Sequence, residues 1–157
     1  MLDLELQWGI DELPLPTQGQ CEKWVLASLI NAEGIESTEL TVRIVSPDES
    51  KELNRDYRQK DKPTNVLSFE FEQPEGLADI GESIPYLGDL VICAEVVASE
   101  AKAQEKTLES HWAHMIVHGA LHLQGYDHIE EKDATEMEAL EIKIMSGLGY
   151  PNPYEIK

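Results

Sequence analysis

The sequence has few cysteines, few basic residues and no long apolar run. Its two cysteines, Cys21 and Cys93, stand 72 positions apart with no other thiol near either. This spacing supports neither a disulfide framework nor a thiolate metal site, and it fits a reducing compartment. Residues 1–10 lack the basic and apolar regions of a secretory signal, and the uninterrupted apolar stretches are too short to span a membrane. We therefore expect a soluble, cytoplasmic protein with no membrane partner.

Positive charge is scarce, because 12 Lys and Arg stand against 31 Asp and Glu, which gives a formal net charge of −19. A surface this acidic repels nucleic acid and anionic lipid, so the composition as a whole argues against a phosphate-rich partner. The 157 residues, 41% of them hydrophobic, suffice for one compact core. We therefore expect residues 1–157 to form a single domain.

The apolar pattern predicts strands first and helices later. Alternating or continuous apolar residues predict strands at 2–8, 41–45, 66–71 and 90–94. Helical spacing predicts helices at 19–31, 47–57, 95–104, 107–124 and 133–147. Ser46 and Pro47 suit the cap and first position of the second helix, and residues 73–85 have the Pro and Gly content of an exposed loop. Because every predicted strand precedes the mainly helical last 63 residues, we expect an α+β fold with about four strands packed against helices.

Histidines are concentrated in one segment, with four between His111 and His122 and the fifth at His128. On a helix, His118 and His122 differ by only about 40° and project from the same face, so their imidazoles can share one metal ion. On a continuing helix His128 would lie about 15 Å further along the axis, out of reach of that ion. The chain must therefore turn after the helix, and Gly125 suits that turn.

This ligand spacing is the one that metzincin proteases use around a catalytic zinc. Three imidazoles leave a fourth position open, as in catalytic rather than structural zinc sites. We therefore predict one Zn²⁺ ion on His118, His122 and His128, in a site formed by a helix and the turn after it. The alternative is that these are ordinary histidines on the surface of a helix.

One residue departs from the protease pattern. The general base of a metalloprotease is the Glu that follows the first His, and Gly119 occupies that position. His114, one turn earlier, and Asp127, beside the third ligand, are candidates for a general base or an orienting partner. The alternatives are a partly exposed helix histidine and an ordinary acidic turn residue. A metalloprotease is therefore the weakest function for this site.

A short basic stretch interrupts the acidic sequence. It contains Arg55, Arg58, Lys60 and Lys62, with Asp56 and Asp61 offsetting two of the four charges. A basic loop beside an open zinc position suits a phosphodiester, because the cation polarises a phosphoryl oxygen while an arginine stabilises the added negative charge. The alternative is a solvated loop whose arginines stabilise the end of a helix.

Three segments together resemble the YbeY family of bacterial zinc-dependent endoribonucleases and ribosomal RNA maturation factors. They are Tyr57–Phe69, Leu87–Ile92 and His118–His128. The resemblance implies a mixed sheet flanked by helices, zinc ligation by His118, His122 and His128, and a required role for Arg58. It also implies processing of the 3′ end of the 16S ribosomal RNA and ribosome quality control.

The leading hypothesis is therefore a metal-dependent hydrolase, a single-strand-specific endoribonuclease in which zinc-activated water attacks the RNA phosphodiester with Arg58 as electrophilic partner. Its expected partners are precursor rRNA and the small ribosomal subunit or ribosomal proteins. The alternative is a ribosome-assembly module with a structural zinc, which the acidic surface favours because most ribosomal proteins are basic.

Overall fold

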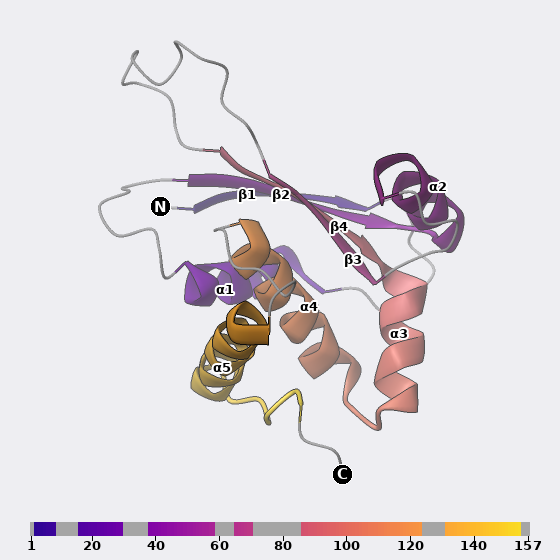
Figure 1. The fold of residues 1–157 in the computed structure, drawn as a ribbon. Coiled ribbons are helices and arrows are strands. Elements are labelled where there is room, and N and C mark those ends of the chain that lie inside the picture. The colour runs from indigo at the N-terminus through magenta and orange to yellow at the C-terminus, as the bar shows by residue number, and fades with distance from the viewer. Residues whose placement is uncertain are drawn as a thin grey trace, which may run out of the picture.

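The computed structural model describes residues 2–8, 16–29, 38–58, 65–70, 86–123 and 131–154, and side chains at some ends of these ranges are left undescribed. The four strands are β1 (Leu2–Trp8), β2 (Thr38–Val45), β3 (Val66–Glu70) and β4 (Tyr86–Cys93). The five helices in these ranges are α1 (Gln18–Ser28), α2 (Pro47–Arg58), α3 (Ala94–Ala103), α4 (Leu108–Leu123) and α5 (Glu131–Gly147). Figure 1 shows their arrangement.

The four strands form one mixed sheet in the order β1-β2-β4-β3. The β1–β2 and β2–β4 pairs are parallel, and β3 runs antiparallel to β4. The prediction of an α+β fold with a mixed sheet of about four strands packed against helices is thus confirmed.

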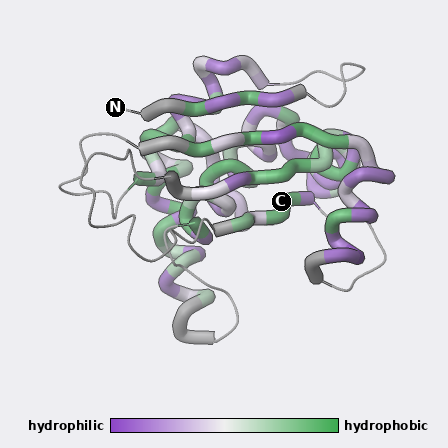
Figure 2. Tube along the Cα trace, turned by 90° about the horizontal axis from the view of Figure 1, so that it is seen from above, coloured by the Kyte–Doolittle hydropathy of each residue, from purple (hydrophilic) through white to green (hydrophobic). Residues whose placement is uncertain are grey.

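Helices cover both faces of the sheet. Helices α1, α4 and α5 lie on one face, and α2 lies on the other (Figure 1). On β4, the side chains of Leu90 and Ile92 point into the larger core, whereas Val91 and Cys93 point into a smaller cluster that includes Leu53 of α2. Figure 2 shows the matching alternation of hydrophilic and hydrophobic residues along β1. The period-2 pattern therefore separates the two faces.

The predicted element boundaries are right to within a few residues, and two differences have clear causes. Strand β4 begins at Tyr86 rather than Leu90, because Gly88 adopts a φ of +142° where β3 passes very close. A Cβ at Gly88 would lie 2.1 Å from the carbonyl oxygen of Phe69, so glycine continues a strand that a sequence pattern starts later. Helix α1 ends at Ser28 and not at Asn31, because Leu29 leaves the helical conformation with a ψ of 67° and its N–H donates to the carbonyl of Leu26.

Other sequence predictions agree with the described residues. Ser46 accepts a hydrogen bond from the backbone N–H of Glu49, as a helix cap does. Both cysteines are free and buried, as expected of core thiols. In the described parts of the chain, no helix has the combination of length and hydropathy that crossing a membrane requires. The predicted loop at 73–85 lies outside the described residues.

Candidate metal centre

Helix α4 carries the histidines through the middle of the molecule. It packs against α1, α3, α5 and the sheet, and 12 of its 16 residues are buried. Its start is capped by Thr107, whose side-chain oxygen accepts from the backbone N–H of Ser110. A helix surrounded on this many sides gives its side chains fixed positions, which a metal site requires.

His118 and His122 lie next to each other on one face of α4, as their spacing predicts. Their ring centroids are 4.7 Å apart, with the ring planes at 78°. Both side chains are half-buried, in contrast to the fully buried neighbours His111 and His114. Two imidazoles that meet at the edge of the core are suited to hold one ion that a substrate can still reach.

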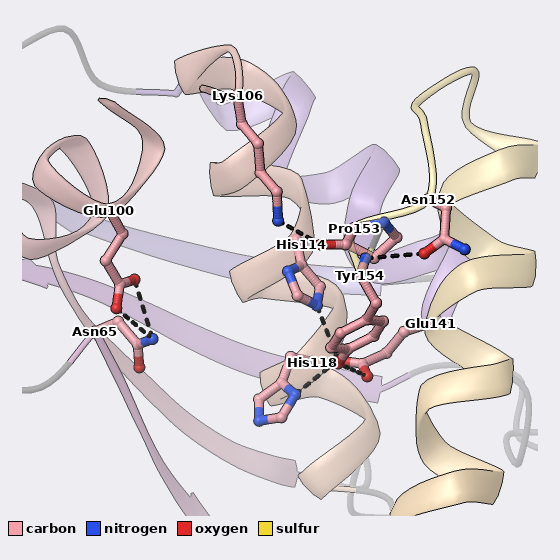
Figure 3. Close-up of polar contacts among 9 residues, drawn as sticks. All are labelled: Asn65, Glu100, Lys106, His114, His118, Glu141, Asn152, Pro153 and Tyr154. Carbon is pink, nitrogen blue, oxygen red and sulfur yellow. Dashed lines mark hydrogen bonds and ion pairs between the residues drawn. The ribbon is translucent and has the colours of Figure 1, made fainter. Parts of the chain in front are cut away.

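A buried carboxylate on α5 holds the first of these imidazoles. Glu141 has no exposed surface, and its Oε1 accepts hydrogen bonds from Nδ1 of His118 at 2.7 Å and Nε2 of His114 at 3.2 Å. Its Oε2 accepts a hydrogen bond from the hydroxyl of Tyr154. Figure 3 shows the three side chains converging on Glu141, with the second ring nitrogen of His118 on the far edge of the ring.

The hydrogen bonds decide the charge of Glu141. Burial alone would raise its pKa, but hydrogen bonds from His114, His118 and Tyr154 together hold the pKa well below the usual range. The pKa of Tyr154 is raised by burial and by its bond to Glu141. At neutral pH the carboxylate is therefore ionised, the phenol keeps its proton, and both histidines donate.

His114, His118 and Glu141 offer ligand atoms within 4.8 Å of one another, close enough for a metal-binding cluster. Two ligands on one tetrahedral zinc stand about 3.4 Å apart, since each is about 2.1 Å from the ion. The 2.7 Å between Nδ1 of His118 and Oε1 of Glu141 is much shorter and matches a charge-assisted hydrogen bond. In this geometry Glu141 acts as a partner of His118 and not as a second ligand beside Nδ1.

Packing explains the glycine at the position of the protease glutamate. A Cβ on Gly119 would lie 2.6 Å from Cδ2 of Leu90, a fully buried side chain of β4. This position of α4 therefore faces the sheet, and a larger residue there would require Leu90 to move. The contact with Leu90 gives a steric reason why glycine occupies the position of the protease base.

A second network lies at the other end of α4. Glu100 of α3 accepts from Nδ2 of Asn65 at 3.1 Å, and its Oε1 also bonds Nε2 of His111 at 3.0 Å. The Asn65 side-chain oxygen accepts from the backbone N–H of Val66 at 2.7 Å. Asn65 thereby fixes the start of β3, directly after residues 59–64, to α3 and α4.

The structure places the remaining predicted residues only in part. Arg58 is the last residue of α2, and its side chain lies outside the described residues. His128, Asp127 and Gly125 also lie outside them, as do Lys60 and Lys62. His114, a candidate base or orienting residue, is buried and bonded to Glu141, which fits orientation better than proton transfer with a substrate. The prediction of Arg58 and His128 thus stays a prediction.

Sequence reasoning missed Glu141 and Tyr154. One signal was present, because Glu141 interrupts an apolar stripe of the last helix between Met137 and Ile144. A carboxylate at such a position is buried and needs partners. The identity of those partners depends on tertiary packing that no local spacing reveals.

Comparisons with known proteins identify the family and agree with the fold. A family model described as Endoribonuclease YbeY matches residues 11–149. The chain is 60% identical over 146 residues to an Endoribonuclease YbeY from Hydrogenovibrio crunogenus, covering 93% of this chain and 91% of that relative. The solution structure of TM1509 from Thermotoga maritima matches with a TM-score of 0.56 and 27% identity, covering 93% of this chain and 87% of that one. The resemblance seen in the sequence is therefore confirmed, and the chain belongs to the YbeY family of endoribonucleases.

Proposed function

We propose that residues 1–157 form one zinc-dependent endoribonuclease domain of the cytoplasm. Its substrate is single-stranded RNA, and its task is to process the 3′ end of the 16S ribosomal RNA and to act in ribosome quality control. One Zn²⁺ ion is held by His118, His122 and His128, and Arg58 is the electrophilic partner. The small ribosomal subunit, or proteins on it, brings the substrate.

The observation that carries this proposal is the adjacent pair of half-buried imidazoles on α4, the first of them held by a buried carboxylate. Their ring centroids lie 4.7 Å apart, and Nδ1 of His118 donates to Glu141. A histidine that binds a metal through one nitrogen commonly donates its other N–H to a carboxylate. The donor set, two or three imidazoles, is one that zinc prefers.

In this proposal the zinc ion and Arg58 have different roles in the reaction. A zinc ion in such a site supplies Lewis-acid polarisation of a phosphoryl oxygen and makes water a stronger nucleophile. The guanidinium of Arg58 stabilises the negative charge that builds up on the phosphoryl oxygens during attack. Gly119 faces Leu90 of the sheet, so this position supplies no carboxylate of the protease kind.

The alternative is a ribosome-assembly module with a structural zinc, which the net charge of −19 favours. Structural zinc sites are closed by four protein ligands. The His118 side chain keeps 17% of its surface exposed, which supports an accessible site instead. The two functions can be distinguished by experiment, because only an endoribonuclease cleaves RNA.

The test of the metal is a His122→Ala variant compared with wild-type protein that is stripped by a chelator and then reloaded with Zn²⁺. We expect the variant to keep its circular dichroism spectrum, to lose bound zinc, and to stop cleaving an RNA that carries the 3′ end of precursor 16S rRNA. Stripping should abolish wild-type cleavage, and reloading should restore it. Unchanged cleavage by the zinc-free variant would overturn the proposal.

The test of the arginine compares Arg58→Glu with Arg55→Glu, an identical charge change at an exposed position one turn earlier on α2. Loss of a group that stabilises transition-state charge costs about 10²–10³-fold in rate. We expect a loss of that size in Arg58→Glu with zinc still bound, and near wild-type cleavage in Arg55→Glu. Equal losses in both would show that the helix needs only its overall positive charge. Small-subunit dependence is read by repeating both assays with purified subunits.

A further inference from the structure

Glu141 places a carboxyl group in the core of the protein. Its side chain has no exposed surface and lies on the side of α5 that carries the buried residues Met137, Ile144 and Met145. An unpaired charge in such a place is very costly, so hydrogen bonds must compensate for the lost water. Its three described hydrogen-bond partners are His114 and His118 of α4 and Tyr154 near the C-terminus.

The arrangement fixes the tautomer and the direction of His118. A carboxylate oxygen accepts hydrogen bonds, so the 2.7 Å contact with Oε1 of Glu141 places the proton on Nδ1 of His118. The Nε2 atom then presents its lone pair at the opposite edge of the ring (Figure 3). The negative charge of Glu141 also makes the imidazole a better electron donor at Nε2.

Glu141 is itself held by the C-terminal segment. The hydroxyl of Tyr154 donates to Oε2, and the backbone N–H of Tyr154 donates to Oδ1 of Asn152 at 2.8 Å. Lys106, in the loop before α4, donates a hydrogen bond from its ammonium group to the backbone carbonyl of Pro153. Residues 152–154 are therefore tied both to the loop before α4 and to the carboxylate behind His118 (Figure 3).

We propose that Glu141 is a positioning residue for His118, and that Tyr154 locks Glu141 in place, so that the C-terminal segment 152–154 helps to set the metal affinity of the site. This rests on the proposed binding of zinc by His118. In this proposal His114 donates from Nε2 to the same Oε1 atom and is not one of the zinc ligands. His118 and Glu141 are 23 residues apart in the sequence, so their contact depends on how α5 packs against α4.

The test measures zinc affinity by competition with a chromophoric chelator, so that it does not depend on RNA cleavage. Glu141→Gln keeps the shape of the side chain and removes its charge, and Glu136→Gln makes the same change at an exposed position of α5. Changing such a carboxylate partner commonly weakens metal binding about 10–100-fold. We expect a loss in that range for Glu141→Gln and wild-type affinity for Glu136→Gln.

A second pair of variants tests the C-terminal segment without touching the carboxylate. Tyr154→Phe removes the hydroxyl that bonds Glu141, whereas Tyr150→Phe removes a hydroxyl that bonds Glu109 on the surface. We expect a severalfold weaker zinc affinity only in Tyr154→Phe. This pair decides the question where Glu141→Gln fails to fold. Substitution of Co²⁺ gives an independent readout, since the visible spectrum of bound cobalt should change in Tyr154→Phe and stay the same in Tyr150→Phe.

The outcomes separate this inference from the function on which it rests. Wild-type zinc affinity in folded Glu141→Gln and in Tyr154→Phe would overturn the positioning role while leaving the three-histidine site intact. Retention of zinc in His122→Ala together with its loss in His114→Ala would overturn both, because His114, His118 and Glu141 would then be the ligands. Loss of zinc in His122→Ala, with only weakened binding in Glu141→Gln, supports both.

Discussion

Gly119 distinguishes this site from that of a metalloprotease at the level of a single residue. In a metalloprotease the position after the first histidine holds the general base, and here its Cβ direction points into Leu90. The side chain of Leu90 is fully buried in the core, so it has little room to move. Changing Gly119 therefore affects packing first and chemistry second.

Gly119→Ala is expected to destabilise the protein, although alanine is the better helix former. Overpacking a core costs about 1–3 kcal/mol, against a gain of up to about 1 kcal/mol from helix propensity. Gly19→Ala in α1 is the matched control, because nothing lies within 4 Å of a Cβ there. Urea unfolding should place Gly119→Ala below Gly19→Ala by about 1–3 kcal/mol. Equal stability of the two variants would mean that Leu90 moves aside freely.

The proximity of His118 and His122 was predictable from sequence, and the position of Glu141 was not. Spacing of four residues places His118 and His122 on one face of any helix, whatever surrounds it. Glu141 reaches His118 only because α5 packs beside α4, and helix packing is not encoded in a local period. The contact between the two histidines is local in the sequence, whereas the contact of His118 with Glu141 joins residues 23 positions apart. An acidic residue inside an apolar stripe points to a buried carboxylate, and only the fold names its partners.

His111 should make the stability of the protein depend on pH. Burial lowers its pKa from the usual value near 6.5, and the charges of His114 and Lys106 lower it further, while the bond and charge of Glu100 oppose this. The unfolded chain then binds a proton at His111 that the folded chain does not. The stability from neutral His111 is complete above about pH 6.5 and is lost as the pH falls below that value.

The measurement is urea unfolding between about pH 7.5 and 5 with a chelator present, for wild type and for His111→Gln. A single group contributes a slope of at most about 1.4 kcal/mol per pH unit. The two proteins differ only at position 111, so the difference between the two curves belongs to His111. The variant should lose less stability on acidification, and parallel curves would contradict the prediction.

At the level of elements, local periodicity predicts the helices and strands but not how they pair. The alternation of β1 and the apolar run of β4 identify both as strands. The order β1-β2-β4-β3 places β4 between β2 and β3, and this depends on contacts between distant segments. The break between α3 and α4 at Glu105 and Lys106 was predictable, because two polar residues interrupt the helical stripe.

That break has an unusual residue at its centre. Glu105 adopts a φ of +56°, the only positive φ of a non-glycine residue in the described ranges. The backbone N–H of Lys106 donates to the carbonyl of Ala101 at 2.9 Å, and that of Glu105 donates to the carbonyl of Lys102 at 3.3 Å. This is the Schellman ending of a helix, in which glycine is the preferred residue at the left-handed position.

Glu105→Gly should therefore stabilise the protein by up to about 1 kcal/mol, because it removes the steric cost of the left-handed conformation. Glu105→Ala removes the same side-chain charge but keeps a Cβ, so it is the control. Thermal unfolding should show a higher midpoint for the glycine variant than for the alanine variant. Equal midpoints would indicate that the flexibility of glycine in the unfolded chain cancels the gain.

At the level of the whole molecule, the charge distribution affects how strongly the protein attracts or repels RNA. The formal net charge of −19 repels a polyanion at long range. Screening limits exposed charges to about 8 Å at physiological salt, so the basic residues from Arg58 to Lys62 can act locally in spite of the total. The acidic surface thus opposes capture of free RNA, which fits the proposal that a ribosomal partner presents the substrate.

Random single-stranded RNA should accordingly bind weakly, and raising the salt from about 50 to 200 mM should weaken this binding far less than it weakens that of a basic RNA-binding protein. A variant with Glu52→Lys, Glu95→Lys and Glu136→Lys changes three exposed positions and moves the net charge from −19 to −13, since each exchange adds two positive charges. Filter binding should show tighter binding of random RNA by this variant at low salt, together with a steeper loss as salt is added. A variant with aspartate at the same three positions controls for the changed side chains and should behave as wild type. Tight binding of random RNA by the wild-type protein at low salt would show that the acidic surface does not protect it, and that no partner is needed for docking.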